Sequence, residues 1–195
     1  MDRTINYYNT NAHNYISGTQ DVEFSELQDA FLELIPAGGY ILDFDCGSGR
    51  DVKYFLDQGF RVDAIDGSEE MVKAATEYAG IPVRQMLFQE LAAVETYDGI
   101  WACSSILHLD FDQLEAVIRK IRTALKPGGI FYTSFKYGDF SGERNSRFFT
   151  DMTEQSFSDL IAKIGGFEIF RMWITSDVRP GREDEKWLNA LLRKI

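Results

Sequence analysis

Apolar residues of this 195-residue chain gather in short runs, and stretches with helical spacing of apolar positions separate these runs. Short apolar runs are typical of buried strands, and the alternation predicts strand–helix–strand units. Because parallel strands need a crossover connection, this order predicts a parallel sheet with helices on both faces. Strands are expected at 40–44, 60–65, 83–88, 99–104 and 130–135. Helices are expected at 24–35, 50–58, 69–79, 112–125 and 153–164.

Cap and turn signals set several of these boundaries. Ser68 is an N-cap residue followed by two glutamates, and Asp112 with Glu115 has the spacing of a capping box. The segment Lys126-Pro127-Gly128-Gly129 is typical of a turn before the strand at 130–135. These signals place helix starts and turns between the apolar runs.

Both ends of the chain depart from the alternation. Residues 1–22 are polar and aromatic, so we expect a loop or short helix outside the core. Residues 136–152 read as a polar insertion. The apolar runs 167–174 and 187–195 have no helix between them, which predicts an antiparallel pair at one edge of the sheet.

Composition narrows the class of partner. The length suits one domain, and the net charge of −11 makes nucleic acid and anionic membranes poor partners. No apolar run approaches the roughly 20 residues of a membrane span, and the polar start is unlike a signal peptide. Cys46 and Cys103 read as buried thiols of a reducing cytoplasm rather than as a disulfide or metal pair.

A glycine turn, Gly47-x-Gly49, follows the strand at 40–44 and precedes a helix. Glycine lets a nucleotide-like ligand approach the backbone, and the helix offers free N–H groups. The motif is weak alone, because Val52 replaces a third glycine. Asp66 lies 17 residues after Gly49 at the next strand end, where an acid can accept ribose hydroxyls or be a solvated turn residue. Asp43 reads either as the partner of a cationic ligand group or as a cap that holds the turn together.

Three segments together resemble the class I S-adenosylmethionine-dependent methyltransferases. They are Ile41-Leu42-Asp43-x-x-Cys46-Gly47-Ser48-Gly49, Val62-Asp63-Ala64-Ile65-Asp66-Gly67-Ser68 and Leu125-Lys126-Pro127-Gly128-Gly129. The aromatic start resembles the N-terminal cofactor cover of small stand-alone bacterial members, often grouped with tellurite-resistance and thiopurine methyltransferases. The resemblance implies an α/β, Rossmann-like three-layer sandwich, whose seven-stranded, mostly parallel sheet has an antiparallel last strand. It implies one domain, 1–195, with an N-terminal cover and helix (1–35), a cofactor-binding core (40–135) and a substrate-side insertion with edge strands (136–195).

The resemblance also implies a cofactor site for S-adenosylmethionine, with S-adenosylhomocysteine as product. The residues it assigns to the cofactor are Tyr8, Tyr15, Asp43, Asp45, Cys46, Gly47, Ser48, Gly49, Asp66, Gly67, Ser68, Met71, Leu87, Phe88, Gln89 and Ser104. Asp45 stands where the family usually has glycine. We expect it to pair with the ammonium of the cofactor beside Asp43, or to turn outward to Arg50.

Candidate acceptor-side residues follow the strands on the active side of the sheet. His108 is a candidate base or substrate contact, with a packing histidine as the alternative. Tyr15 is a second candidate for catalysis, and it also reads as simple packing against the sheet edge. Arg144 and Arg179 are candidate substrate contacts for carboxylate or phosphate, unless they are solvated loop charges. No metal site is expected.

These observations favour methyl transfer to a small molecule by in-line displacement, in a cytoplasmic monomer or homodimer. One alternative is a non-catalytic protein of this fold that binds S-adenosylmethionine or a nucleotide. The other is an NAD-dependent oxidoreductase, which shares the glycine turn and ribose acid but needs a third glycine and a second domain.

Overall fold

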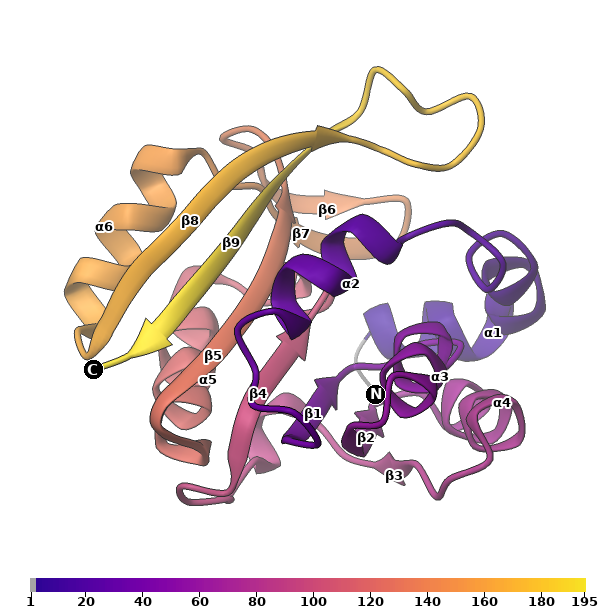
Figure 1. Cartoon of the computed structure of the whole chain (residues 1–195). Coiled ribbons are helices and arrows are strands. Elements are labelled where there is room, and N and C mark those ends of the chain that lie inside the picture. The colour runs from indigo at the N-terminus through magenta and orange to yellow at the C-terminus, as the bar shows by residue number, and fades with distance from the viewer. Residues whose placement is uncertain (1–2) are drawn as a thin grey trace.

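A seven-stranded sheet organises the chain, whose computed structural model describes residues 3–195. The strand order is β3-β2-β1-β4-β5-β9-β8 (Figure 1). The strands are β1 (Tyr40–Phe44), β2 (Arg61–Asp66), β3 (Arg84–Gln85), β4 (Tyr97–Ala102), β5 (Leu125–Lys136), β8 (Phe167–Ser176) and β9 (Lys186–Lys194). Strands β1 to β5 pair in parallel, and β9 is antiparallel to both β5 and β8. The predicted mixed sheet with an antiparallel last strand is confirmed.

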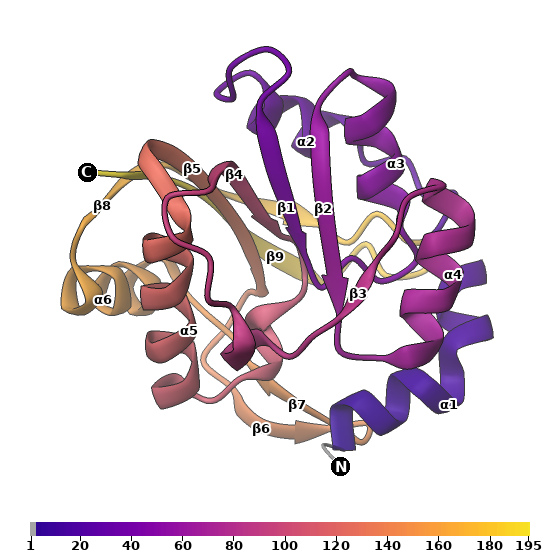
Figure 2. The ribbon, with the colours of Figure 1, turned by 90° about the horizontal axis from the view of Figure 1, so that it is seen from below.

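Helices cover both faces of the sheet and complete the three layers. Helices α5 and α6 lie on one face, and α2, α3 and α4 lie on the other (Figure 2). The helices are α1 (Arg3–Ser17), α2 (Ser25–Leu32), α3 (Arg50–Asp57), α4 (Glu69–Ala79), α5 (Phe111–Ala124), α6 (Glu154–Ile164) and the 3-10 turns η1 (Phe88–Glu90) and η2 (Ile106–His108). Within residues 3–195, no helix combines the length and apolar character needed to cross a bilayer.

Aromatic side chains fill the core between the sheet and α2. The fully buried Trp101 of β4 stacks on Tyr132 of β5, with ring centroids 3.9 Å apart. Phe31 of α2 and Phe55 of α3 pack against the same indole ring. Such stacking adds about 0.5–1.5 kcal/mol to the burial of each pair. This core fixes the position of β4 beside β1, so that their carboxyl ends meet at one edge of the sheet.

The N-terminal segment forms a full helix, where a loop or short helix was expected. Helix α1 is 15 residues long, with a kink at Asn11. It packs against α4 and β7, lying between them in Figure 2. Its sequence is rich in tyrosine, asparagine and threonine, and its few apolar residues recur at helical spacing. Contacts with α4 and β7 stabilise this helix, which is longer than the short helix among the expectations.

Several boundaries differ from the expectation. The cap of α5 is Asp110 with Gln113, whose backbone N–H donates to Asp110 at 2.9 Å, rather than Asp112 with Glu115. Strand β5 begins at Leu125 and bulges through the expected Lys126–Gly129 turn, because Tyr97 pairs with Leu125 and Gly99 with Ile130. Strand β3 has only two residues, 84–85, because η1 follows it closely.

The polar insertion contains a small hairpin of β6 (Ser141–Arg144) and β7 (Arg147–Thr150). Its turn residues Asn145 and Ser146 both have positive φ, of 50° and 63°. Two such residues make the twisted two-residue turn that hairpins prefer. The hairpin follows β5 and lies beside α1, over the carboxyl edge of the sheet (Figure 2).

Candidate functional site

A cavity of about 920 Å³ opens at the carboxyl edge of the sheet. Its walls come from the glycine turn after β1, the ends of β4 and β5, α1, the β6–β7 hairpin and the loop between β8 and β9. Ligand pockets of α/β sheets lie at this edge. The predicted site residues in its lining are Tyr8, Tyr15, Asp45, Cys46, Gly47, Ser48, Ser104, His108 and Arg179.

The glycine turn adopts backbone angles that favour glycine. Gly47 and Gly49 have φ of 55° and 82°. A Cβ at Gly49 would lie 3.0 Å from Cα of Ala75, so this glycine lets α3 and α4 pack closely. A Cβ at Gly47 would lie 3.6 Å from the ring of Tyr15. The backbone of Gly47 is therefore bare on the side that faces α1 and the cavity.

Asp66 lies next to this turn, as the ribose-acid hypothesis requires. Its carboxylate accepts hydrogen bonds from the Gly47 N–H at 2.9 Å and the Ser68 N–H at 2.7 Å. Burial raises its pKa to about 6, although both backbone N–H groups oppose that shift. Ser68 caps α4, as predicted, by accepting from the Met71 N–H. The acid is thus held in place by the turn that would contact the cofactor.

Asp43 supplies a buried oxygen without a partner. Its side chain is 2% exposed, and among residues 3–195 Oδ2 has no hydrogen-bond partner. Burial raises the pKa of this carboxyl well above its usual range, and the nearby Asp51 adds to the effect. An unsatisfied buried acid is costly unless a ligand donates to it. The position fits the N–H donors of an amino-acid-like group beside the glycine turn.

Asp45 does not turn outward to Arg50, contrary to one of the two expected orientations. Its carboxyl lies close enough to that of Asp66 for each to shift the pKa of the other, and it lies near the Gly67 amide. Burial and the charge of Asp66 raise its pKa well above its usual range. Arg50 instead holds Asp51 through two hydrogen bonds, at 2.8 and 3.0 Å. Asp45 is therefore directed toward the ribose acid.

The buried Asp51 is a site residue that sequence reasoning missed. Besides Arg50, it accepts from Gln28 at 2.7 Å and from the Trp101 indole N–H at 2.9 Å. Burial alone would raise its pKa, but Arg50 and these donors lower it. The ionised pair forms the floor of the cavity beside the glycine turn. The sequence indicated only that Asp51 is an acidic residue in the first turn of a helix, which is a common and uninformative position.

His108 lies in a hydrogen-bonded chain at the other end of the cavity. Its Nδ1 lies 2.7 Å from the carbonyl oxygen of Phe148, which can only accept, so Nδ1 carries the proton. In the neutral ring, Nε2 then accepts from the Tyr8 hydroxyl at 2.9 Å. Burial raises the pKa of Tyr8 to about 12, with Arg147 opposing. Burial also raises the pKa of Tyr15, so both phenols remain protonated.

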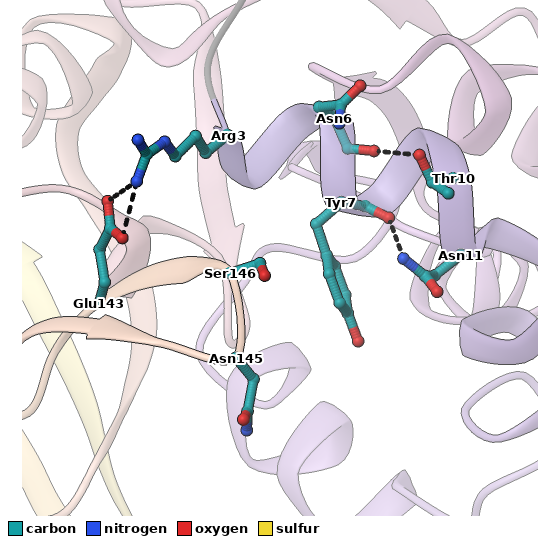
Figure 3. Close-up of a pocket in the computed structure, with 8 residues that line it drawn as sticks. All are labelled: Arg3, Asn6, Tyr7, Thr10, Asn11, Glu143, Asn145 and Ser146. Carbon is teal, nitrogen blue, oxygen red and sulfur yellow. Dashed lines mark hydrogen bonds and ion pairs between the residues drawn. The ribbon is translucent and has the colours of Figure 1, made fainter.

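Helix α1 and the hairpin are joined outside the cavity. Figure 3 shows the groove between them, with an ion pair from Arg3 Nη1 to Glu143 at 3.0 Å. Figure 3 also shows the Tyr7 side chain pointing toward the hairpin turn. On the cavity side, the Arg147 guanidinium lies 4.3 Å from the Tyr7 ring centroid. The two elements therefore form one cover over the site.

The arginines expected to contact substrate lie in different surroundings. Arg144 forms an ion pair with the buried Asp151 and is absent from the cavity lining among the described residues, so we do not assign it a substrate contact. Arg179 lines the cavity, but it is paired with Asp177 at 2.5 Å. Arg147, opposite Arg144 in the hairpin, lines the cavity beside Tyr8.

Several of the residues predicted to contact the cofactor lie outside the cavity lining. Helix α1 covers the turn after β2, where Ile5 lies 3.4 Å from a Cβ placed on Gly67 and the Ser68 hydroxyl donates to Asn9 at 2.7 Å. Met71 is buried below that turn, and Leu87 is exposed at its rim. Phe88 packs on Phe44, which turns its ring toward the core. The remaining predicted cofactor residues outside the lining are Asp43, Gly49, Asp66 and Gln89.

Comparison with known proteins agrees with this architecture. Residues 41–129 match the sequence model of a family described as a methyltransferase domain. A ubiquinone biosynthesis O-methyltransferase from Xanthomonas axonopodis pv. citri is 32% identical over 108 residues, covering 52% of this chain and 44% of that protein. An S-adenosyl-L-methionine-dependent Diels-Alderase from Talaromyces variabilis is 33% identical over 107 residues, covering 50% of this chain and 36% of that protein. The chain thus spans less than half the length of these curated relatives.

A solved structure extends the likeness to nearly the whole chain. The Burkholderia thailandensis 1,6-didemethyltoxoflavin-N1-methyltransferase, with bound 1,6-didemethyltoxoflavin and S-adenosylhomocysteine, superposes with a TM-score of 0.78 at 22% identity. The superposition covers 97% of this chain and 86% of that chain. At this identity the likeness shows the fold alone. Residues 41–129 therefore match a methyltransferase domain, and the chain shares its fold with a solved methyltransferase structure that holds S-adenosylhomocysteine.

Proposed function

We propose that this protein transfers a methyl group from S-adenosylmethionine to a small-molecule acceptor by in-line displacement. The observation that carries the proposal is the glycine turn, which holds Asp66 by a backbone N–H and adjoins the unsatisfied oxygen of Asp43. Asp43 would hold the ammonium group of the cofactor, Asp66 the ribose hydroxyls, and the Gly47–Gly49 backbone the chain between them. When bound, the cofactor supplies an electrophilic methyl group on a sulfonium.

Other residues around the cavity would align the acceptor, exclude water or take the acceptor's proton in this proposal. The cavity is large enough for small ligands and runs from the glycine turn to His108. Methyl transfer needs alignment and exclusion of water, which α1 and the hairpin provide as a cover. For an acceptor that carries a proton, the Tyr8 oxygen takes that proton while the Tyr8 hydroxyl proton passes to His108 Nε2. Tyr15 would pack over Gly47 and keep its own proton.

The acceptor class and setting are also part of the proposal. The net charge of −11 disfavours nucleic acid and anionic membranes as acceptors. Two free cysteines, Cys46 and Cys103, suit a reducing cytoplasm. We infer a cytoplasmic enzyme that acts on small molecules as a monomer or homodimer.

Calorimetric titration with S-adenosylhomocysteine tests cofactor binding. The proposal predicts saturable binding to the wild type and a loss of at least about tenfold in Asp66→Asn, about 1.4 kcal/mol. Asp63→Asn is the matched control, because Asp63 lies on the same strand but pairs with Arg84 and Tyr97. Tight binding of NAD without binding of S-adenosylhomocysteine would favour the oxidoreductase alternative instead.

A second candidate is a protein that binds the cofactor without consuming it. The contact between Asp45 and Asp66 favours this candidate, because a second acid at the ribose position competes with the ligand. The Diels-Alderase relative is also named for a reaction other than methyl transfer. We expect Asp45→Gly to change S-adenosylhomocysteine affinity by about tenfold or less, roughly 1.4 kcal/mol. A gain of a hundredfold would mean that Asp45 suppresses the site.

A further inference from the structure

We propose that Arg147 selects an acceptor that carries a carboxylate, and that it holds this group beside Tyr8 and His108. The inference rests on the proposed methyl transfer and names the substrate class of that reaction. The charged residues that line the cavity are the first observation that supports it.

The cavity contains one lysine or arginine without an acidic partner among the described residues. The lysine and arginine residues that line it are Arg50, Lys136, Arg147, Arg179 and Arg182. Four of these have a carboxylate within ion-pair distance: Arg50 has Asp51, Lys136 and Arg182 share Glu185, and Arg179 has Asp177. In residues 3–195, Arg147 has no such partner. Its charge is therefore not neutralised from within the described protein.

Arg147 is half-buried, and its surroundings shield one guanidinium nitrogen from water without replacing its hydrogen bond. Its guanidinium lies 4.3 Å from the Tyr7 ring centroid and 5.1 Å from that of Phe149. The Nε atom is buried and has no hydrogen-bond partner among the described residues. Nη1 donates to the Tyr8 hydroxyl at 3.3 Å, a long bond to a neutral group. A partly desolvated cation of this kind gains most from an anionic ligand.

Arg147 lies next to the residues that take the acceptor's proton in the proposed mechanism. Tyr8 contacts both the Arg147 guanidinium and His108 Nε2. A carboxylate on Arg147 would therefore place the rest of an acceptor next to the proton acceptor of the proposed mechanism. The guanidinium therefore orients an anionic acceptor with its carboxylate toward the hairpin.

A carboxylate suits the site better than a phosphate dianion. One uncompensated guanidinium neutralises one negative charge, and the other lining cations are already paired. The aromatic rings of Tyr8, Phe149 and Trp187 in the lining favour a flat, apolar body. We therefore expect an aromatic carboxylic acid.

Binding of matched acid and amide probes to the protein saturated with S-adenosylhomocysteine tests the inference. The probes are 4-hydroxybenzoate, salicylate and indole-3-acetate, each compared with its primary carboxamide by ligand-observed NMR. The wild type is expected to bind at least one acid about tenfold or more tightly than its amide, since a charged hydrogen bond of this kind is worth about 1.5–3 kcal/mol. Arg147→Gln should abolish this preference, and Arg147→Lys should keep part of it.

Arg171→Gln is the matched control, because Arg171 also stacks on an aromatic ring, 4.5 Å from the Trp173 centroid, but lies outside the cavity lining. It should leave the preference unchanged. The inference is overturned if no acid binds better than its amide, or if the preference survives Arg147→Gln. It is also overturned if Arg147→Gln weakens S-adenosylhomocysteine itself, because the guanidinium would then hold the cofactor carboxylate. Failure of the wild type to bind S-adenosylhomocysteine would instead count against the proposed function.

Discussion

The buried carboxyl group of Asp45 lies close enough to that of Asp66, the acid at the end of β2, for each to shift the pKa of the other. Two buried carboxyls in contact share a proton, because two adjacent carboxylates repel each other. Asp45 also has φ of 83°, in the left-handed region that favours glycine. Asp45, in the glycine turn after β1, thus combines backbone strain with a shared proton.

Asp45→Gly is expected to stabilise the fold. Glycine relieves the left-handed strain and removes one acid of the pair, while its greater freedom in the unfolded chain offsets part of the gain. We expect the free energy of unfolding at pH 7 to rise by about 1 kcal/mol in urea denaturation. Glu95→Gly is the control, because Glu95 has φ of 42° but lies on the surface, away from both acids. A lower stability of Asp45→Gly, with Glu95→Gly unchanged or improved, would contradict this account.

Cofactor binding and stability should respond to pH in opposite directions. The folded-state pKa of Asp66 is raised from 3.8 to about 6, so its contribution to stability is present below about 3.8 and is lost as pH rises through 6. Ribose hydroxyls donate to the ionised carboxylate, so S-adenosylhomocysteine affinity should rise over the same interval. The free energy of unfolding and the affinity for S-adenosylhomocysteine are measured for wild type and Asp66→Asn between pH 4.5 and 7.5. The contributions of the other acids are common to both proteins and cancel in the difference. The same pH dependence in both proteins would exclude Asp66 as the group responsible.

Tyr8→Phe should slow methyl transfer without weakening the cofactor. The substitution removes the hydroxyl that joins Arg147 to His108 Nε2 but keeps the ring. General acid–base catalysis contributes about 10²–10⁴-fold, so we expect kcat to fall by at least tenfold for an acceptor that carries a proton. S-adenosylhomocysteine affinity, measured by calorimetry, should stay within about threefold. Tyr7→Phe is the matched control, and an equal loss in both variants would argue for packing alone.

Asp51 should be important for stability. Arg50, Gln28 and Trp101 all donate to its carboxylate, and its removal leaves the Arg50 cation in a buried site. Asp51→Ala should lower the free energy of unfolding by about 3–5 kcal/mol in urea denaturation. Asp57→Ala, on the same helix, removes an exposed pair with Lys53 and should cost less than about 1 kcal/mol. If both variants lose similar amounts of unfolding free energy, the buried hydrogen bonds of Asp51 add little to the stability of the fold.

The sequence predicted the parts of the fold that local patterns determine. The bounds of β1 and α4 agree with the expectation, because an apolar run ends at a glycine turn and Ser68 caps the next helix. A loop or short helix was expected where helix α1 forms, and contacts with α4 and the hairpin extend it to 15 residues. The hairpin was also missed, since its short strands alternate weakly.

The sequence predicted the location of the site residues that stand at the ends of parallel strands. Gly47, Asp66 and Ser104 each follow a parallel strand, so the sheet brings them to one edge. The roles of the arginines were not predictable, because Arg144 and Arg147 lie in the same polar segment and only the tertiary structure pairs one of them with Asp151. The direction of Asp45 depended on backbone angles that the sequence pattern does not reveal.

The most direct test of the central claim follows S-adenosylmethionine labelled in its methyl group. The protein is incubated with it and with a pool of small carboxylic acids, thiols, amines and metalloid oxyanions, and S-adenosylhomocysteine and labelled products are quantified together. The account predicts many turnovers, with equal amounts of S-adenosylhomocysteine and methylated acceptor, and a fall of at least about tenfold in Asp66→Asn. Binding of S-adenosylmethionine that stays intact with every acceptor, or no binding at millimolar concentration, would contradict it.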